Sequence, residues 1–478
     1  MLILSGAAPA GAHGFGQRYD LPIPLSFYLW GAGAVVAFSF AVFAVFLTGH
    51  WAARPLQQLR LPMHGIWQAT GRWLAGTVRM FATVGFLMVV LAGIIGDPNP
   101  FRNIAPTMIW IVGWVGIAFL SACIGNVWQV LNPWDTLFQV VQTAHSRLGA
   151  GKLSPHRVYP AWLGAWPAFV FFVTFGWMEL VWGGRNVPSD LAAALIVYSA
   201  MTWMAMLVFG REAWLEKGEF FNLVFGIFSR FAPLVTHCNG ERAVEIRLPA
   251  SGLLDDRPLH PSVIALVLAL LATVTFDGLL ETPLWAQVDL AVLDAPADSF
   301  LWTGLGLREE QAIRLVRTVA LPCFILLVAA AYLLVCWLMS LLSGSSARAL
   351  SRRFVLSLVP IALAYHVAHY FSYLLIGGQY AIPLVSNPFG WGWDLFGTAS
   401  YRVDIGLIGP RLQWQVAVIA VVLGHVIAVY VAHVTALRIF HTRRLALLSQ
   451  IPMLLLMVGY TMCSLWILSQ PIVETGAG

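Results

Sequence analysis

Apolar residues run along this chain in long stretches that short polar segments interrupt. Ten stretches reach the roughly 20 residues that a helix needs to cross the hydrocarbon core of a bilayer. They are residues 25–49, 75–97, 104–130, 160–183, 189–209, 262–285, 314–343, 353–377, 414–435 and 449–470. The pattern predicts an all-α fold, a polytopic membrane helix bundle with about ten transmembrane helices.

The charges between these stretches predict how the bundle is oriented. Alternate connections carry 19 of the 27 Lys and Arg residues, and the opposite set carries the other eight. Cytoplasmic loops are rich in Lys and Arg, so the first set is expected inside and both chain termini outside. One missed span would invert every later connection, so this agreement along the whole chain supports the count of ten.

A single transmembrane domain, residues 25–477, is expected after an outer N-terminal tail, residues 1–24. Cleavage of that tail just before His13 is an alternative to an intact tail. The cytoplasmic segment 210–258 contains EFFNLVFGIFSRFAPL, an amphipathic pattern typical of a helix in the membrane interface. The outer segment 378–413 is rich in Gly, Pro and aromatic residues, which suits a lid or docking loop.

Composition agrees with a membrane protein and narrows the classes of partner. Of the 478 residues, 59% are hydrophobic and 10% are charged, whereas soluble proteins carry about 25% charged residues. No basic run has interleaved aromatic residues, so we expect the lipid bilayer as a partner and no nucleic acid. The five cysteines show no paired spacing, which argues against a disulfide framework.

Three histidines lie inside predicted spans, where imidazoles are unusual. The stretch AYHVAHYFSYLL places His366 and His369 three residues apart, on one face of a helix. His425 lies near the middle of the span 414–435. If these two neighbouring spans pack together, the three imidazoles converge near the centre of the membrane.

Three carboxylates are expected at a similar depth. The sequence TFDGLLETPLW carries Asp277 and Glu281 four residues apart, and TFGWMELVW carries Glu179. Acidic side chains within spans are costly and usually mark a functional interior. Imidazole and carboxylate together are ligands that zinc and manganese accept.

We therefore predict a buried divalent metal site, zinc or manganese, that generates hydroxide for a hydrolytic reaction. Four residues are assigned as metal ligands: His366, His369, His425 and Glu179. Asp277 and Glu281 are assigned to catalysis, as a general base or a further ligand.

The buried histidines are also compatible with roles other than hydrolytic metal binding. They can be packing residues with satisfied hydrogen bonds. Two histidines on facing helices can also ligate haem b, and a copper-binding redox subunit is a related alternative. His366 and His369 are too close together to serve the two tiers of a dihaem bundle. A transporter or metal-handling protein can use the same polar layer as a pathway.

Several blocks of the sequence resemble one family of bacterial integral membrane proteins. They are HGFGQRYDLPIPLSFYL, GNVWQVLNPWDTLF, FGREAWLEKGEFFNLVFGIFSRFAP, TVTFDGLLETPLW, AYHVAHYFSYLLIGGQY and NPFGWGWDLFGTA. Some members of that family are described as fenitrothion hydrolases, membrane-bound organophosphate hydrolases with more than one subunit. The resemblance runs from residue 13 to about residue 470. It implies cleavage of a small apolar aryl phosphotriester to a phenol, a possible second membrane subunit, and location in the bacterial cytoplasmic (inner) membrane.

Overall fold

The computed structural model describes residues 19–47, 59–62, 65–149, 154, 157–237, 243–255, 257–296 and 298–472. Within these residues, nine helical segments are long and apolar enough to cross a membrane. They are α1 (Leu25–Phe46), α3 (Gly65–Ile95), the segment Ile104–Cys123, α9 (Pro188–Phe209), α12 (Pro261–Leu280), α14 (Glu309–Ser343), the segment Ala347–Ser386, α18 (Pro410–Ile439) and α19 (Arg443–Ser469). The predicted helical membrane bundle is thereby confirmed. Residues 1–18 of the predicted outer tail, including His13, lie outside the described residues.

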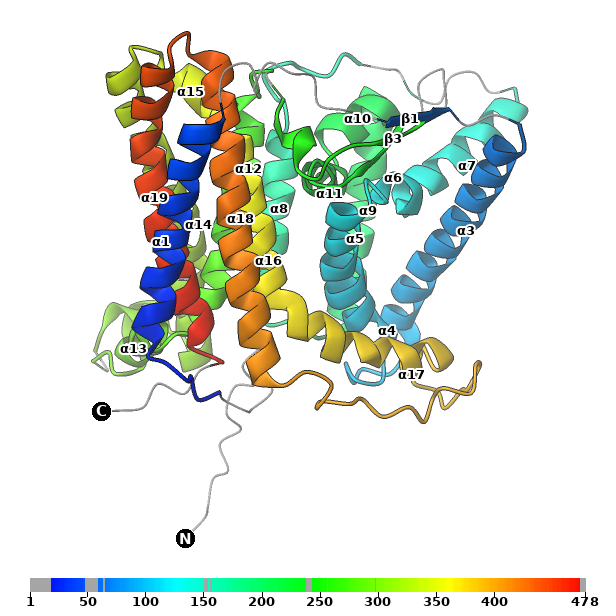
Figure 1. Cartoon of the computed structure of the whole chain (residues 1–478). Helices are drawn as coiled ribbons and strands as arrows, with labels where there is room; N and C mark the ends of the chain where they lie inside the picture. Colours follow the sequence, from blue (N-terminus) through cyan, green and yellow to red (C-terminus); the bar gives the residue numbers. More distant parts are fainter. Residues whose placement is uncertain are drawn as a thin grey trace.

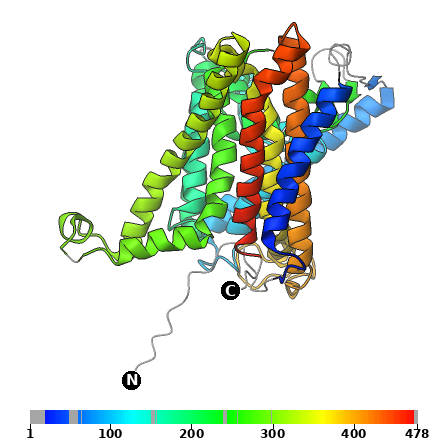
Figure 2. The ribbon, with the colours of Figure 1, turned by 60° about the vertical axis from the view of Figure 1, so that its left-hand side comes forward.

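The remaining predicted span, 160–183, contains a shorter helix. It is α8 (Trp166–Leu180), which has 15 residues where a full crossing takes roughly 20. One face of α8 packs against the buried helix α12 (Figure 1), whereas Trp166 and Val170 on its other side are exposed. The start of α1 and the end of α19 lie at the same end of the bundle (Figures 1 and 2).

Helices α12 and α16 (Val359–Ser372) form the centre of the molecule. They pack against each other, and α16 also packs along α18 while α12 packs along α8 and α14. Almost every side chain of α12 after Val263 is buried, and so is nearly all of α16. A titratable side chain on either helix is therefore surrounded by protein and shielded from lipid.

Irregular helical turns shape the segment around α16. It begins with the 3-10 turn η4 (Val355–Leu358) and ends in the π-helix η5 (Tyr373–Gly377), the 3-10 turn η6 (Gly378–Tyr380) and α17 (Ala381–Ser386). The chain bends beyond α16, so α17 lies against α4 (Ile104–Pro106), at the opposite end of that segment from α5 (Ile117–Cys123) (Figure 1). A second π-helix, η1 (Thr107–Gly116), joins α4 to α5. π-Helical turns frequently mark functional sites.

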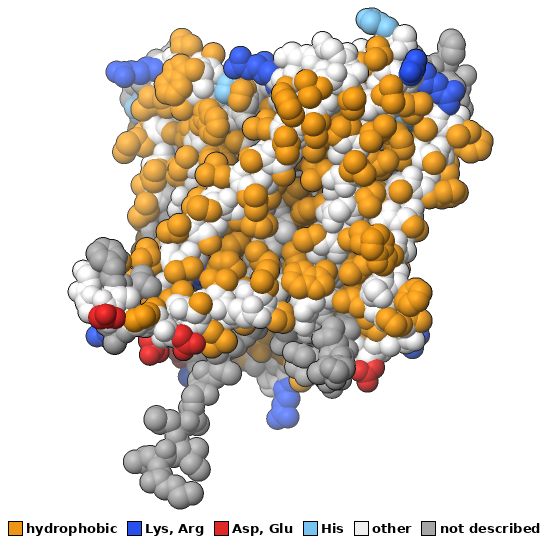
Figure 3. Space-filling view, turned by 90° about the vertical axis from the view of Figure 1, so that its left-hand side faces the viewer, with side chains coloured by type: hydrophobic (Ala, Val, Ile, Leu, Met, Phe, Trp, Pro, Cys, Tyr) orange, Lys and Arg blue, Asp and Glu red, His pale blue; other side chains and the backbone are white. Residues whose placement is uncertain are grey.

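The end of the molecule that holds α10 (Arg211–Lys217) and α15 (Ala347–Phe354) carries several arginines and is called the arginine-rich end below (Figures 1 and 3). A small antiparallel sheet of β1 (Leu59–Pro62), β3 (Ala243–Ile246) and β2 (Leu234–His237) lies here, in that order. Its Arg60–Glu245 register pair forms an ion pair at 3.4 Å. Apolar periodicity did not predict this sheet, because each strand has only four residues.

The segment expected at the membrane interface contains α11 (Phe220–Ser229). Its apolar side chains are buried against α5 and α8, so α11 belongs to the protein core at the arginine-rich end. The remaining elements are short or peripheral: α6 (Trp128–Leu131), α7 (Pro133–Arg147), η2 (Ser251–Leu253), α13 (Pro283–Leu293) and η3 (Phe300–Gly304).

Gly424 allows α18 to approach α16 closely. A Cβ atom at this position would overlap Ala364 Cβ and lie 2.8 Å from the Pro360 carbonyl oxygen. We expect Gly424→Ala to push the helices apart and to lower the thermal unfolding midpoint of the purified protein. Overpacking of this kind costs about 1–3 kcal/mol. Gly459→Ala on α19 is the matched control, since nothing lies within 4 Å of its added Cβ. Equal midpoints for the two variants would contradict the proposed close packing.

Candidate functional site

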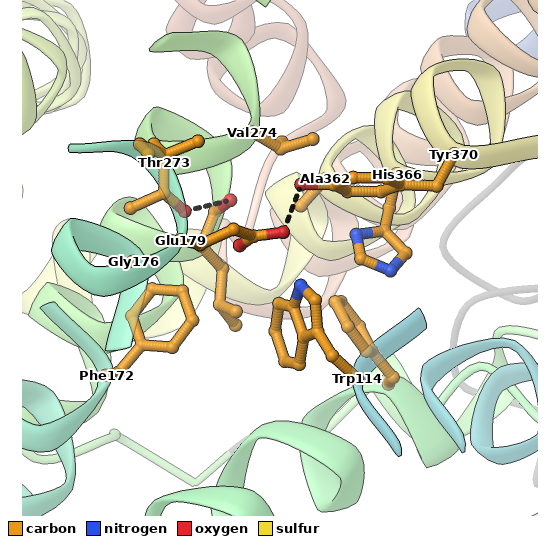
Figure 4. Close-up of a pocket in the computed structure, with 12 residues that line it drawn as sticks. Trp114, Phe172, Gly176, Glu179, Thr273, Val274, Ala362, His366 and Tyr370 are labelled. Carbon is orange, nitrogen blue, oxygen red and sulfur yellow. Dashed lines mark hydrogen bonds between the residues drawn. The ribbon is translucent and has the colours of Figure 1, made fainter. Parts of the chain in front are cut away.

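A hydrogen-bonded chain of four titratable side chains joins α8, α12 and α16 inside the bundle. His369 Nε2 lies 2.8 Å from Asp277 Oδ2. The Tyr370 hydroxyl lies 2.9 Å from the same Asp277 oxygen. It also lies 3.1 Å from Glu179 Oε1, the bond drawn in Figure 4. The side chains of His369 and Asp277 are each only 6% exposed. The chain therefore links four titratable groups by hydrogen bonds, and its His369–Asp277 end is shielded from bulk water.

Glu179 is held near the end of α8 by contacts of its backbone. Arg185 Nη1 donates to the Glu179 carbonyl oxygen at 3.1 Å, and Trp110 Nε1 donates to the Arg185 carbonyl at 2.8 Å. These bonds fix the last turn of α8 against η1. The guanidinium also adds a positive charge near the Glu179 carboxyl group, which reduces the cost of burying it.

Glu179 and His366 border a small cavity at the centre of the site. Its volume is about 10 Å³, close to the space that one water molecule needs. The walls are Trp114, Phe172, Gly176, Glu179, Leu180, Phe228, Leu270, Thr273, Val274, Ala362, His366 and Tyr370. Figure 4 shows the Glu179 carboxylate, the His366 ring and the Trp114 indole directed toward one another. A water held here would have several polar partners.

Two ring nitrogens at this cavity have no hydrogen-bond partner among the described residues. They are His366 Nε2 and Trp114 Nε1, and both are buried. The His366 ring meets Trp114 edge-on, with ring centroids 5.5 Å apart, and Tyr370 at 4.7 Å. Buried polar atoms are nearly always hydrogen-bonded, so these two nitrogens point to a small polar ligand such as water.

The two histidines of α16 therefore have different surroundings, although they are three residues apart. His369 contacts Asp277 on α12, while His366 lies among aromatic rings of η1, α5 and α11. Both rings adjoin Tyr370, at centroid distances of 4.8 and 4.7 Å. The structure thus gathers four of the predicted site residues around one tyrosine: Glu179, Asp277, His366 and His369.

The other two predicted residues have different contacts. The His425 ring places Nδ1 2.8 Å from the Val421 carbonyl of its own helix and lies 5.9 Å from the Tyr460 ring on α19. Glu281 follows the last residue of α12, is only partly buried, and is not among the cavity-lining residues. Packing of α16 on α18 was predicted correctly, but it does not bring the His425 ring into the cavity wall.

The donor types at the site suit zinc or manganese, because imidazole and carboxylate occur together with an unpartnered imidazole nitrogen. As the side chains stand, however, the described residues contain no group of three or more His, Cys, Asp or Glu placed to hold one metal ion. Metal binding, haem binding and copper binding therefore stay predictions.

No family model, curated protein or solved structure matches the chain.

Trp114 is the site residue that the sequence pattern did not predict. Nothing in its apolar surroundings distinguishes it from a packing residue. Its position follows from the π-helix η1, which aligns Trp110 and Trp114 four residues apart, so that both contact Phe175 at 5.1 Å between ring centroids.

Proposed function

We propose that this protein is a membrane-embedded hydrolase that activates water in the cavity between Glu179 and His366. The proposed substrate is a small apolar aryl phosphotriester, the class that the family resemblance implies. One observation carries the proposal: a buried imidazole nitrogen and a carboxylate border a space of water size, and no described residue pairs with that nitrogen.

In the proposed reaction, His366 Nε2 is the general base and accepts a proton from the bound water. The water oxygen forms a bond to phosphorus while the bond from phosphorus to the aryl oxygen breaks. The aryl oxide leaves with the proton that His366 had accepted, giving a phenol and a phosphodiester. Trp114 Nε1 donates a hydrogen bond to the attacking oxygen and orients it.

The hydrogen-bonded chain holds the Glu179 carboxylate in position through Tyr370. Tyr370 lies between the two carboxyl groups, and Asp277 in turn orients His369. The carboxylate that borders the water is thus positioned through Tyr370, while His366 remains the base. Here Glu179 and His366 contact the water, while Tyr370, Asp277 and His369 are positioning residues.

The substrate would come from the bilayer, since the cavity accommodates a water but not an ester. A separate pocket of about 280 Å³ with almost wholly apolar walls lies on the other face of α8. Its lining includes Trp110, Phe175 and Met178, and Phe175 packs against Trp114. Movement of these aromatic side chains would connect the apolar pocket to the water.

We place the protein in the bacterial cytoplasmic membrane, with the arginine-rich end inside and both termini outside. The support is the charge asymmetry of the connecting segments, which follows the positive-inside rule. A second membrane subunit, which the resemblance implies, is part of the same proposal.

Hydrolysis by the purified protein in liposomes tests the proposal, with phenol release from fenitrothion as the readout. We expect His366→Phe to lower the rate at least about a hundredfold, because loss of a general base typically costs that much or more. His433→Phe removes another buried imidazole, one that bonds Gln450 on α19, and should leave the rate nearly unchanged.

Absence of phenol release by the wild-type protein, alone and with its partner subunit, would refute the hydrolase. Equal rates for the two histidine variants would refute the role of His366. Metal analysis by mass spectrometry and a visible spectrum belong to the same experiment. Stoichiometric zinc or manganese in the purified protein would support the predicted metal site, and a Soret band would indicate haem b.

A second function, proton-coupled transport, is favoured by one observation. The His369–Asp277–Tyr370–Glu179 chain connects three helices through hydrogen bonds of 2.8–3.1 Å inside the membrane domain. Such chains of titratable groups carry protons in pumps and transporters. Proteoliposomes that contain a pH-sensitive dye distinguish the two functions. A proton-coupled transporter should take up protons when a substrate gradient is imposed, whereas a hydrolase should not.

A further inference from the structure

A polar pocket at the arginine-rich end lies apart from the membrane site. Its volume is about 470 Å³. It is formed where the end of α11, strand β2, the η2 turn and the start of α6 meet (Figure 1 shows these elements together). The lining residues are Asn126, Gln129, Ser229, Arg230, Leu234, Val235, Arg247, Ser251, Gly252, Leu254, Asp255 and Arg257.

Arg247 is fixed in this pocket by the backbone around it. Its Nε donates to the Ala232 carbonyl at 3.0 Å, and Nη2 donates to the carbonyls of Ser229 and Arg230 at 2.9 and 3.1 Å. Gly252 lies against the same guanidinium, and a Cβ there would overlap it. These contacts hold the planar group in one orientation, which suits recognition of an oxyanion.

Positive charge exceeds negative charge among the described lining residues. Three arginines line the pocket with one aspartate. Asp255 accepts two hydrogen bonds from the Arg257 guanidinium, at 3.1 and 3.0 Å, and its Oδ2 lies 3.3 Å from Arg230 Nη1. The single carboxylate therefore faces two guanidinium groups, whereas the Arg247 guanidinium donates to backbone carbonyl oxygens.

The pKa values of the pocket residues agree with this charge balance. Burial lowers the pKa of the Arg247 guanidinium, and although Glu245 opposes that shift, Arg230 adds to it. Burial alone would raise the pKa of the Asp255 carboxyl, but hydrogen bonds and charges from Arg257 and Arg230 together lower it. A bound anion would offset the cost of the buried Arg247 charge.

Two further polar atoms of the pocket are buried and have no hydrogen-bond partner within the described residues. They are Asn126 Oδ1 and the Ser251 hydroxyl oxygen. The Ser251 hydroxyl can donate to a phosphate oxygen alongside arginine, whereas Asn126 Oδ1 is an acceptor and can bond only to a protonated phosphate oxygen. Charge, fixed geometry and an unused hydroxyl donor thus coincide in one pocket of sufficient size.

We propose that this pocket binds a phosphate group, presented by an anionic lipid headgroup or by a small soluble phosphate compound. Both sources offer the same oxyanion to Arg230 and Arg247. Basic pockets beside transmembrane helices on the cytoplasmic side are known to bind lipid headgroups. The proposal is independent of the reaction at the membrane site.

Thermal unfolding of the full-length protein in lipid nanodiscs tests the pocket. The protein is placed in phosphatidylcholine alone, in phosphatidylcholine with phosphatidylglycerol, and in phosphatidylcholine with added inorganic phosphate. We expect one of the last two conditions to raise the unfolding midpoint, relative to matched chloride. Stabilisation by phosphatidylglycerol alone assigns a headgroup, whereas stabilisation by inorganic phosphate assigns a soluble ligand. No stabilisation in either condition would overturn the proposal.

Arg230→Gln should weaken the phosphate-dependent stabilisation, with roughly tenfold lower apparent affinity, because a charge-assisted contact is lost. Arg348→Gln is the matched control: it removes the same charge from an exposed position on α15 at the same end. Equal affinities for the two variants would overturn the proposal. Ser251→Ala serves as a second variant if Arg230→Gln does not fold, and affinity equal to that of the wild type would count against the pocket.

Discussion

Replacing Asp277 by alanine is expected to remove activity and to destabilise the bundle at the same time. One oxygen of this carboxylate accepts hydrogen bonds from both His369 and Tyr370. The variant leaves a buried imidazole and a buried hydroxyl without that acceptor, at a cost of about 1–3 kcal/mol each. We expect hydrolysis to fall at least a hundredfold and the unfolding midpoint to drop clearly in a thermal scan.

Asp277→Asn separates the two effects. The amide keeps the shape and one acceptor oxygen, so the unfolding midpoint should stay closer to that of the wild type. The amide cannot take up a proton as the carboxylate does, so activity should still fall if Asp277 positions His369 as an acceptor. Full activity in Asp277→Asn would show that the carboxylate charge is unnecessary, and would exclude the hydrogen-bonded chain from the reaction.

Glu219→Ala should be among the most destabilising single changes at the arginine-rich end. Glu219 is fully buried and caps α11, accepting from the backbone N–H groups of Phe221 and Asn222 at 3.1 and 2.9 Å. Its oxygens also accept from Tyr198 at 2.6 Å and Trp128 at 3.1 Å. Alanine leaves these donors unpaired, and we expect a loss of about 3 kcal/mol or more in the free energy of unfolding.

The matched control for this prediction is Glu216→Ala, three residues earlier on the exposed face of α10. Surface substitutions of this kind usually change stability by less than about 0.5 kcal/mol. Denaturant unfolding, followed by tryptophan fluorescence, would report both variants because Trp128 and Trp134 pack near the capped helix. Similar stabilities for Glu216→Ala and Glu219→Ala would mean that the buried carboxylate is not a structural cap.

The order and placement of the membrane helices could be predicted from apolar stretches because a bilayer requires long apolar helices. Each predicted span contains a helix, although the one at 160–183 is shorter than its apolar stretch. Strands of four residues, π-helical turns and the bend after α16 could not be predicted in this way. They depend on contacts between segments that are far apart in the sequence.

The residues of the candidate site could likewise be predicted only in part. Four site residues could be found from the sequence: Glu179, Asp277, His366 and His369. An ionisable residue inside an apolar span costs so much free energy that it usually has a function. His425 and Glu281 satisfied the same rule, yet their contacts and positions keep them out of the cavity wall. Depth in the membrane can be estimated from span order, whereas the direction of a side chain depends on helix rotation.

The sequence by itself determined that this is a helical membrane protein with ionisable groups inside four of its predicted spans. Only the tertiary structure decided that Tyr370 joins two carboxylates, that His366 and His369 contact different groups, and that Trp114 completes the cavity. The physical reason is that hydrophobicity fixes which segments enter the bilayer, whereas the rotation and tilt of packed helices fix which polar atoms meet.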